Sequence, residues 1–370
     1  MLRTSSLVGA LVARGFDVTI FSMVGRKPDY LAGKSSGTEL INEHLREHVD
    51  RGRFWAAMQL AAYRLGLPPF WITLVLALIT PRKLQELLAS CDAVIVDFPF
   101  LYPLANATSK PVALNTHNVE ANLWQSRWVK RLVAMIEQRA ARNVQHVFCC
   151  SESDRAFFTP LAGAGRASIV PNGIDPSRFA GIAAERGPLR AMLGYTPGDR
   201  VLLFAASSFG PNVEALEWLE RFVAEHQALL IQKNLHFLVA GSVSKQPFDR
   251  PRLKAVGMVS RIEPYFAVAD LAFNGVTRGS GTNVKMAEFI AAGLPILTSP
   301  AGMRGYDLVD DVDCIVFTPD TLAKVIAEST VLNDLGRHAA MTKSAYEKNK
   351  RLIDMNWCIE PLVKWLEQLR

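Results

Sequence analysis

Short apolar runs alternate with segments of helix length along most of the chain, and this alternation strongly narrows the folds open to it. Each run has the length of a short strand and ends in polar residues or a turn: residues 17–21, 94–96, 112–114, 147–150, 168–170, 201–205, 237–240, 271–274, 295–298 and 314–317. Strands that alternate with helices form parallel sheets with helices on both faces. The sequence therefore predicts an α/β fold in which functional residues follow the carboxyl ends of strands.

A turn-rich segment, PNGID at residues 171–175, interrupts this alternation near the middle of the chain. Proline and glycine break regular structure, and 370 residues are enough for about two domains. We predict a first domain over residues 1–172, a second over 173–350, and a terminal helix over 351–370 that packs back towards the first domain.

Composition argues against several classes of protein. The five cysteines are scattered and show no pair of CxxC spacings, which disfavours a disulfide framework or a zinc cluster and fits the reducing cytoplasm. The net charge of +6 comes mostly from the first half of the chain, which suits a phosphorylated substrate or an anionic membrane surface. No basic run with interleaved aromatic residues supports binding to nucleic acid.

Three segments have both a structural and a membrane-related interpretation. Residues 7–13 could form the core of a signal peptide, but the arginine-glycine stop and the strand at 17–21 favour a helix followed by a strand. Residues 70–80 are apolar but too few to span a bilayer, which takes about 20, so they form either a buried helix or a surface that dips into the membrane interface. Residues 120–143 have the pattern of a basic amphipathic helix that either covers a sheet or contacts a membrane.

The segment with the clearest chemistry is GSGTNVKMAE at residues 279–288, which lies between a strand and a second strand and opens a helix. Its small residues let the backbone approach a ligand closely, and the free amides of the first helical turn suit a phosphate group. Lys285 and Glu288 share a helix face, so that the ammonium can lie beside a diphosphate and the carboxylate can accept the paired hydroxyls of a ribose. On spacing alone, a glycine-capped helix with a solvated Lys–Glu pair remains the alternative.

Four segments, taken in order, resemble the family 4 glycosyltransferases: THNVE at 116–120, SES at 151–153, PNGID at 171–175, and the stretch 280–298. Each is weak alone, but the set is specific and covers nearly the whole chain. The resemblance implies an α/β, GT-B fold, in which two Rossmann-like doubly wound domains have the cleft between them. It also implies a retaining sugar transfer from a nucleotide diphosphate donor without a cofactor or a required metal, and the sequence has no metal-ligand cluster to contradict that.

The resemblance also assigns roles to individual residues. It places Glu288 at the donor ribose, and His117 beside the transferred sugar and the donor phosphate, where a hydrogen bond steadies developing charge. Without that context a single histidine is more often structural, and Glu120 is a weaker candidate that could simply start the next helix. The predicted donor-binding residues are Ser207, Asn212, Ser280, Gly281, Thr282, Asn283, Lys285 and Glu288.

The sequence departs from the family pattern at three positions. Ser280 stands where many relatives have a glutamate, and Ser207 and Asn212 are neutral where relatives often have an arginine and a lysine. An unbalanced diphosphate in a partly dry cleft is costly, so other cations must compensate. The candidates are Lys285, Arg278 and Arg261, of which Lys285 has the best defined position.

Family members usually open with a strand and a glycine loop ahead of a helix that residues 2–14 resemble; neither precedes Met1, and we therefore expect a gap between strands of the first sheet. The expected enzyme is cytoplasmic, with possible peripheral contact at the inner face of the membrane. It would act in polysaccharide or cell-envelope synthesis on a glycan or lipid-linked acceptor. A truncated, non-catalytic relative that binds nucleotide or a partner is the main alternative, and a GT-B enzyme of other chemistry, such as a sugar-nucleotide epimerase, is a third.

Overall fold

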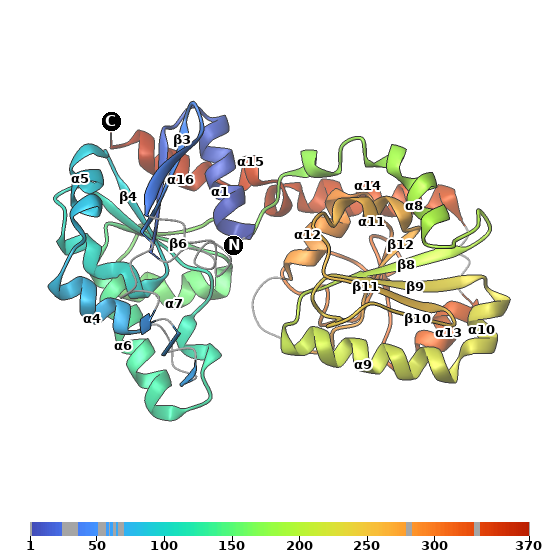
Figure 1. Cartoon of the computed structure of the whole chain (residues 1–370). Coiled ribbons are helices and arrows are strands. Elements are labelled where there is room, and N and C mark those ends of the chain that lie inside the picture. Colours follow the sequence, from blue (N-terminus) through green and yellow to red (C-terminus); the bar gives the residue numbers. More distant parts are fainter. Residues whose placement is uncertain are drawn as a thin grey trace. The chain divides into compact units, whose positions relative to one another are not determined.

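The computed structural model describes residues 2–23, 36–50, 57–58, 60–61, 64–65, 70–278, 283–328 and 334–369. The chain divides into two compact units (Figure 1). The first joins Met1–Pro171 to Cys358–Arg370, and the second is Asn172–Trp357. Both units are built on parallel strands that alternate with helices, as the sequence predicts.

The main sheet of the first unit has four parallel strands in the order β4-β5-β6-β7. They are β4 (Val94–Asp97), β5 (Val112–Asn115), β6 (His146–Cys149) and β7 (Ala167–Ile169). Leu114 and Val147 on the two interior strands are fully buried, because parallel sheets are covered on both faces. The helical elements of this unit are α1 (Leu2–Ala13), α4 (Phe70–Leu78), α5 (Arg82–Ser90), η1 (Pro99–Asn106), η2 (Glu120–Leu123), α6 (Arg127–Asn143), α7 (Glu152–Ala162) and α16 (Glu360–Glu367).

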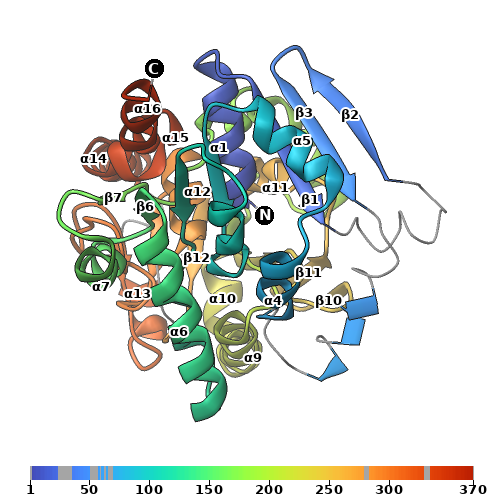
Figure 2. The same ribbon diagram turned by 90° about the vertical axis from the view of Figure 1, so that its left-hand side faces the viewer.

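Three further strands of the first unit form a separate sheet. After α1 the chain enters β1 (Val18–Met23), which pairs in parallel with β3 (Leu45–Asp50), and β3 pairs antiparallel with β2 (Gly37–Asn42) (Figure 2). The expected helix followed by a strand is therefore confirmed. Among the described strands, none of this sheet is hydrogen-bonded to the four-stranded sheet, so the strands of the first unit form two sheets and not one.

The apolar segment at residues 70–80 forms α4 and the turn after it. Thr73 is buried and its hydroxyl donates to the carbonyl of Phe100 at 2.9 Å, whereas Leu74 and Leu78 are exposed. The helix thus packs on η1 through one face and leaves apolar side chains at the surface. No helix in the parts of the chain that the structure describes is long and apolar enough to span a membrane.

The sheet of the second unit has the strand order β10-β11-β9-β8-β12-β13-β14, with only the edge strand β10 antiparallel to its neighbour. Without β10, this is the strand order of doubly wound dinucleotide-binding domains. The strands are β8 (Arg200–Ala205), β9 (Leu235–Ala240), β10 (Phe248–Arg250), β11 (Leu253–Gly257), β12 (Leu271–Asn274), β13 (Ile296–Thr298) and β14 (Ile315–Val316).

Helices cover both faces of this sheet (Figure 1). One face carries α9 (Gly210–Glu225), α10 (Gln227–Gln232) and α13 (Leu322–Glu328), and the other carries α8 (Arg186–Met192), α11 (Glu263–Val268), α12 (Val284–Ala291) and α14 (Leu335–Ile353). Successive side chains of a strand point to opposite faces, so Phe204 of β8 packs in the core beneath α9 while Leu203 packs in the core beneath α11 and α12. The remaining elements are η3 (Pro176–Phe179), η4 (Ile182–Glu185) and α15 (Met355–Cys358).

Candidate functional site

The sheet of the second unit has its topological switch point between β8 and β12. The chain runs outward in one direction through β9 and β11, and in the other through β13 and β14. Ligands of open α/β sheets bind outside the carboxyl ends of strands at such a point. Ser207 and Asn212 follow β8, and Asn283, Lys285 and Glu288 follow β12. The fold therefore brings the described members of the predicted donor-binding set to one edge of one sheet.

The connections at this edge approach one another closely. Gly241 follows β9 with a φ of 109°, and a Cβ atom on it would lie 2.3 Å from the carbonyl oxygen of Ala206, which follows β8. Only glycine combines this backbone conformation with such a contact. The side-chain oxygen Oδ1 of Asn274, at the end of β12, is buried without a hydrogen-bond partner among the described groups. The edge is thus tightly built and carries an acceptor with no donor.

Lys285 lies against the segment that follows β8. Its Nζ atom donates to Oδ1 of Asn212 at 2.5 Å and lies 5.2 Å from the ring centroid of Phe204. Nδ2 of Asn212 in turn donates to the carbonyl of Ser207 at 3.0 Å. Burial, which removes water from the ammonium, lowers the pKa of Lys285 to about 7 against the opposing pull of Glu288. The structure thus places a cation from α12 beside the two neutral residues, as an anion site there requires.

Glu288 is buried on α12 and is held by an arginine that the sequence did not single out. Nη1 of Arg178, in η3, lies 3.4 Å from Oε1 of Glu288, and Nη2 of the same guanidinium lies 2.7 Å from Oε1 of Glu263. Burial raises the pKa of Glu288, and the charge of Arg178 partly offsets this. One arginine therefore sits between two carboxylates, one of which is the predicted ribose ligand.

The other predicted donor-site residues make surface ion pairs or backbone contacts, or lie outside the described residues. Arg278 and Arg261 form exposed ion pairs with Glu214 and Glu185, as ordinary surface charges do. Asn283 precedes α12, and its Nδ2 lies 3.4 Å from the carbonyl of Gly302. The remaining members of the predicted set lie outside the described residues: Ser280, Gly281 and Thr282.

His117 lies in the first unit, two residues beyond β5. Its Nε2 is 2.8 Å from Oδ1 of Asp97, the last residue of β4, and its ring stacks on Phe98 with centroids 4.3 Å apart. Because the carboxylate can only accept, this contact assigns the proton to Nε2 when the ring is neutral and leaves Nδ1 as an acceptor. Phe98 has a φ of 83°, a left-handed conformation that is rare for an aromatic residue and is found disproportionately at functional sites.

A polar network fixes the carboxylate that orients His117. Asp97 accepts from Oγ1 of Thr4 at 2.6 Å and from Nδ2 of Asn115 at 2.6 Å, and Arg3 donates to Oδ1 of Asn115 at 2.8 Å. Burial opposes ionisation of Asp97, but the contact with His117 and the two donors outweigh it and hold the pKa below its usual value. The histidine is thus set by an ionised carboxylate, an arrangement that fixes its tautomer.

Glu120, three residues after His117, lies in a segment whose backbone is anchored by another glutamate. Glu120 is buried at the start of η2, and desolvation raises its pKa. Its backbone N–H donates at 2.6 Å to Oε1 of Glu137, and the N–H of Ala121 donates to the other carboxylate oxygen at 3.0 Å. Glu137 of α6 therefore anchors the segment that carries the histidine. No group of three or more His, Cys, Asp or Glu side chains in the described parts of the chain could hold a metal ion.

Comparisons with known proteins agree with this architecture. Residues 2–173 match the family model "Glycosyl transferase 4-like domain", and residues 199–332 match "Glycosyl transferases group 1". No curated protein sequence matches the chain.

Three examples illustrate the solved structures with similar folds. HepE of Anabaena, in complex with UDP, is 15% identical with a TM-score of 0.62, covering 95% of this chain and 99% of its own. Sucrose-phosphate synthase of Thermosynechococcus elongatus is 16% identical with a TM-score of 0.64, covering 99% and 92%. The UDP-forming trehalose-phosphate synthase of Burkholderia vietnamiensis is 12% identical with a TM-score of 0.67, covering 99% and 98%. At these identities the likeness concerns the fold.

Proposed function

The chain belongs to the glycosyltransferases with the GT-B fold, and on that premise we propose that it moves a sugar from a nucleotide diphosphate to a glycan or lipid-linked acceptor with retention of configuration. The observation that carries the proposal is the cluster at the switch point of the second unit. There Lys285 meets Asn212, and Glu288 lies one turn further along α12. A buried cation beside a buried carboxylate matches the diphosphate and the ribose of a donor.

The chemistry assigned to these residues follows from where charge develops. When the sugar leaves the diphosphate, negative charge grows on the leaving phosphate and positive character grows on the sugar. Lys285 would stabilise the leaving group, because a fixed cation in a partly dry site acts more strongly than in water. His117, with its tautomer set by Asp97, would hydrogen-bond to the sugar or to the donor phosphate. Neither role needs a metal ion.

Nucleotide titration tests the donor-binding part of the proposal. HepE, a neighbour in fold, binds UDP and UDP-glucose, so UDP is the first ligand to try, followed by GDP and ADP. Glu288→Gln should weaken binding of the matching nucleotide by about 1 to 3 kcal/mol, because it removes a charged acceptor. Glu328→Gln changes an exposed carboxylate of the same unit, on α13, and should leave binding unchanged. Unaltered affinity in Glu288→Gln would remove that residue from the site.

Turnover separates an enzyme from a non-catalytic relative. Slow hydrolysis of the donor in the absence of acceptor gives a measurable rate, and His117→Ala should lower that rate more than it lowers donor affinity. The same rate measured with EDTA tests independence from metal ions. A protein that binds nucleotide tightly but never cleaves a nucleotide sugar would support the non-catalytic alternative.

A lipid-linked acceptor would require contact with a membrane surface, and the first unit offers one. Trp128 and Met135 of the basic helix α6 are exposed, as are Leu74 and Leu78 of α4. Apolar side chains beside basic ones bind the interface of anionic bilayers. We expect co-sedimentation with vesicles that contain anionic lipid and not with neutral vesicles, and the double variant Leu74→Ser, Leu78→Ser should weaken it. Equal recovery in the supernatant with both vesicle types would rule out this contact.

A further inference from the structure

The second unit contains a cavity away from the donor-site residues. It has a volume of about 420 Å³ and lies where β9 and β11 begin, together with the segment before β8 and the edge strand β10. The donor-site residues instead follow strands at their carboxyl ends. Because these strands are parallel, the two places lie at opposite edges of the sheet. The lining is mostly polar and includes Tyr195, His236, Asp249, Arg250, Arg252 and Lys254.

Positive charge dominates this lining. Three of the residues are cations and one is a carboxylate. Arg250 is paired with Glu220 at 2.8 Å outside the cavity, and Lys254 is paired with Asp249 at 2.9 Å. Arg252 forms no ion pair within the described residues. The cavity thus has a cation without a counter-charge.

Arg252 and Asp199 compete for the same ring nitrogen of His236. Nη1 of Arg252 donates to Nε2 of His236 at 2.6 Å, yet the same ring nitrogen lies 3.1 Å from Oδ1 of Asp199. One nitrogen either accepts from the guanidinium or donates to the carboxylate. An oxyanion in the cavity would take the guanidinium, for which it is the better acceptor, and would leave His236 free to donate to Asp199.

Lys254 crosses the cavity beside the ring of Tyr195. Its Nζ is 5.8 Å from that ring centroid and donates to the carbonyl of Leu193 at 2.5 Å as well as to Asp249. The carboxylate of Asp249 is 70% exposed and pairs with Lys254, where a bound anion would compete with it. The hydroxyl of Tyr195 is buried and has no hydrogen-bond partner among the described groups. A buried hydroxyl without a hydrogen-bond partner is costly, so it is a further group that could donate to an oxyanion.

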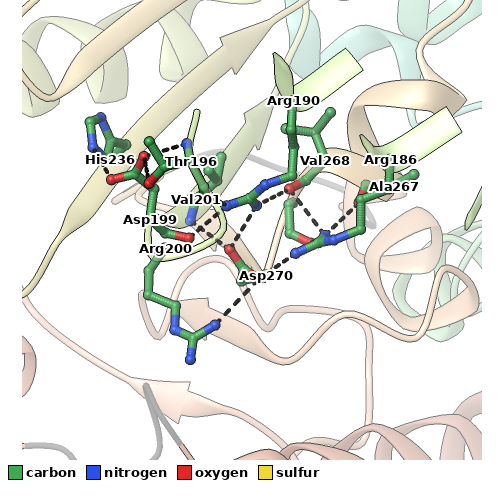
Figure 3. Close-up of polar contacts among 11 residues, drawn as sticks. Arg186, Arg190, Thr196, Asp199, Arg200, Val201, His236, Ala267, Val268 and Asp270 are labelled. Carbon is green, nitrogen blue, oxygen red and sulfur yellow. Dashed lines mark hydrogen bonds and ion pairs between the residues drawn. The ribbon is translucent and has the colours of Figure 1, made fainter. Parts of the chain in front are cut away.

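A network behind the cavity holds its wall in place (Figure 3). Nη2 of Arg190 donates to the carbonyls of Thr196 and Asp199 at 3.0 and 2.6 Å, which fixes the turn after Tyr195. Its Nη1 donates to Asp270, which also accepts from Arg186 at 2.6 Å. Hydrogen bonds to Asp270 and to backbone carbonyls occupy the guanidinium groups of Arg186 and Arg190, so the wall is formed before any ligand binds.

We propose that this cavity binds the phosphate group of a small molecule, through Arg252, Lys254 and the hydroxyl of Tyr195. A site of this volume accommodates a compact phosphate ester, and an arginine fork with a lysine is suited to a phosphate dianion. The site is independent of the nucleotide donor.

Calorimetric titration of the full-length protein at fixed ionic strength tests the proposal, with inorganic phosphate and glucose 6-phosphate as probes and glucose as the blank. We expect saturable binding of at least one phosphate probe. Tighter binding of glucose 6-phosphate would mean that the cavity also holds the organic part of an ester, and equal binding would mean that it holds the free ion. Binding of neither probe would overturn the proposal.

Three variants have different expected effects. Arg252→Gln should weaken phosphate binding by about tenfold or more. Tyr195→Phe should weaken it several-fold while the melting temperature stays equal to or above that of the parent, because the lost hydroxyl has no partner. Asp249→Asn should strengthen binding several-fold, because it removes the anion that competes for Lys254.

Lys324→Gln is the matched control, since this lysine is an exposed cation of the same unit paired with Glu328, and the variant should bind phosphate normally. UDP affinity should be unchanged in all four variants, which separates this cavity from the donor site. If the phosphate affinity is unchanged in both Arg252→Gln and Asp249→Asn, the anion binds elsewhere.

Discussion

Among the described residues, Lys285 supplies most of the positive charge of the proposed donor site. Ser207 and Asn212 are neutral, and Arg178 is already divided between Glu263 and Glu288. The ammonium has an amide and an aromatic ring for neighbours, and the pull of Glu288, which is itself paired with Arg178, only partly offsets the cost of burying the charge. A diphosphate would supply the missing counter-charge, so donor binding and the protonation of Lys285 are coupled.

This coupling predicts a pH dependence of donor binding. Burial lowers the pKa of Lys285 to about 7, so the free protein loses the ammonium as pH rises through 7, whereas the bound diphosphate favours the protonated form. Nucleotide affinity should fall roughly fivefold between pH 7 and pH 8. Calorimetry in buffers of different ionisation enthalpy should show proton uptake on binding.

Two variants at the same position separate Lys285 from other titrating groups. Lys285→Arg stays charged and should bind with little pH dependence over this range. Lys285→Met should bind weakly at every pH. A pH dependence that survives in Lys285→Met would belong to the nucleotide or to another side chain.

Sequence reasoning proposed Lys285, Glu288 and His117 as site residues, but it did not predict the residues that contact them. Arg178 and Glu263 are far apart in the chain, and no local spacing links either of them to Glu288. Asp97 had an available signal, because it ends a strand next to the one that precedes His117. Neighbouring parallel strands bring their carboxyl ends together. Polar residues at the ends of two successive strand-like runs can therefore be predicted to lie close to each other.

At the scale of elements, α6 is tied to η2 by one carboxylate that is fully buried. Burial raises the pKa of Glu137 to about 7, against the pull of the two backbone N–H donors. In the unfolded chain this carboxyl has its ordinary pKa of 4.5, so its contribution to stability is fully present below that pH and is lost as pH rises through about 7. Burial also raises the pKa of Glu288 in the second unit, but that carboxylate is paired with Arg178.

Glu137→Gln tests this contribution. The amide can accept from only one of the two N–H groups, so the variant should be less stable than the parent at pH 5. The difference in unfolding free energy should shrink by roughly 1 to 3 kcal/mol between pH 5 and pH 8, because only the parent must bury a charge at the higher pH. Chemical denaturation at both pH values measures it, and a difference that does not change with pH would show that Glu137 titrates normally.

The close approach of the segments after β8 and β9 makes a second prediction about elements. Gly241→Ala would place a Cβ atom 2.3 Å from the Ala206 carbonyl oxygen in a backbone conformation that alanine rarely adopts. We expect a loss of about 2 kcal/mol or more in stability, together with weaker nucleotide binding, because the same segments border the donor site. Gly210→Ala, with nothing within 4 Å of the added Cβ, is the control and should be tolerated. Equal stability of the two variants would show that the edge is loosely built.

Apart from β11, the apolar strands of the two main sheets were predictable, and the polar edge strands were not. β5, β8 and β12 are continuous apolar runs because they are buried on both faces, and their positions agree with the predicted runs to within a residue or two. β2 is mostly exposed and reads GTELIN, which has no alternation to mark it as a strand. β10 is three residues long and pairs only with β11. Such segments become strands because they pair with a neighbouring strand, and no local sequence pattern encodes that pairing.

At the scale of the whole molecule, the predicted functions fall on different units. Every described donor-site residue belongs to the second unit, whereas His117 and the network around Asp97 belong to the first. The first unit is discontinuous: α16 returns to it from the far end of the chain, and Trp365 packs edge-on against Phe148 of β6 with centroids 5.9 Å apart. The second unit is one continuous segment. Nucleotide binding and catalysis should therefore be separable.

A fragment of residues 172–357 should fold alone and bind the donor nucleotide. It contains the complete seven-stranded sheet and both of its cores, which supply the burial that stabilises a domain of this size. Its nucleotide affinity should lie within a few-fold of that of the whole chain, and Glu288→Gln should weaken both to the same extent. The fragment should not hydrolyse a nucleotide sugar, because it lacks His117. A folded fragment without nucleotide affinity would mean that the first unit contributes contacts to the donor, and the assignment of binding to Lys285 and Glu288 alone would then be wrong.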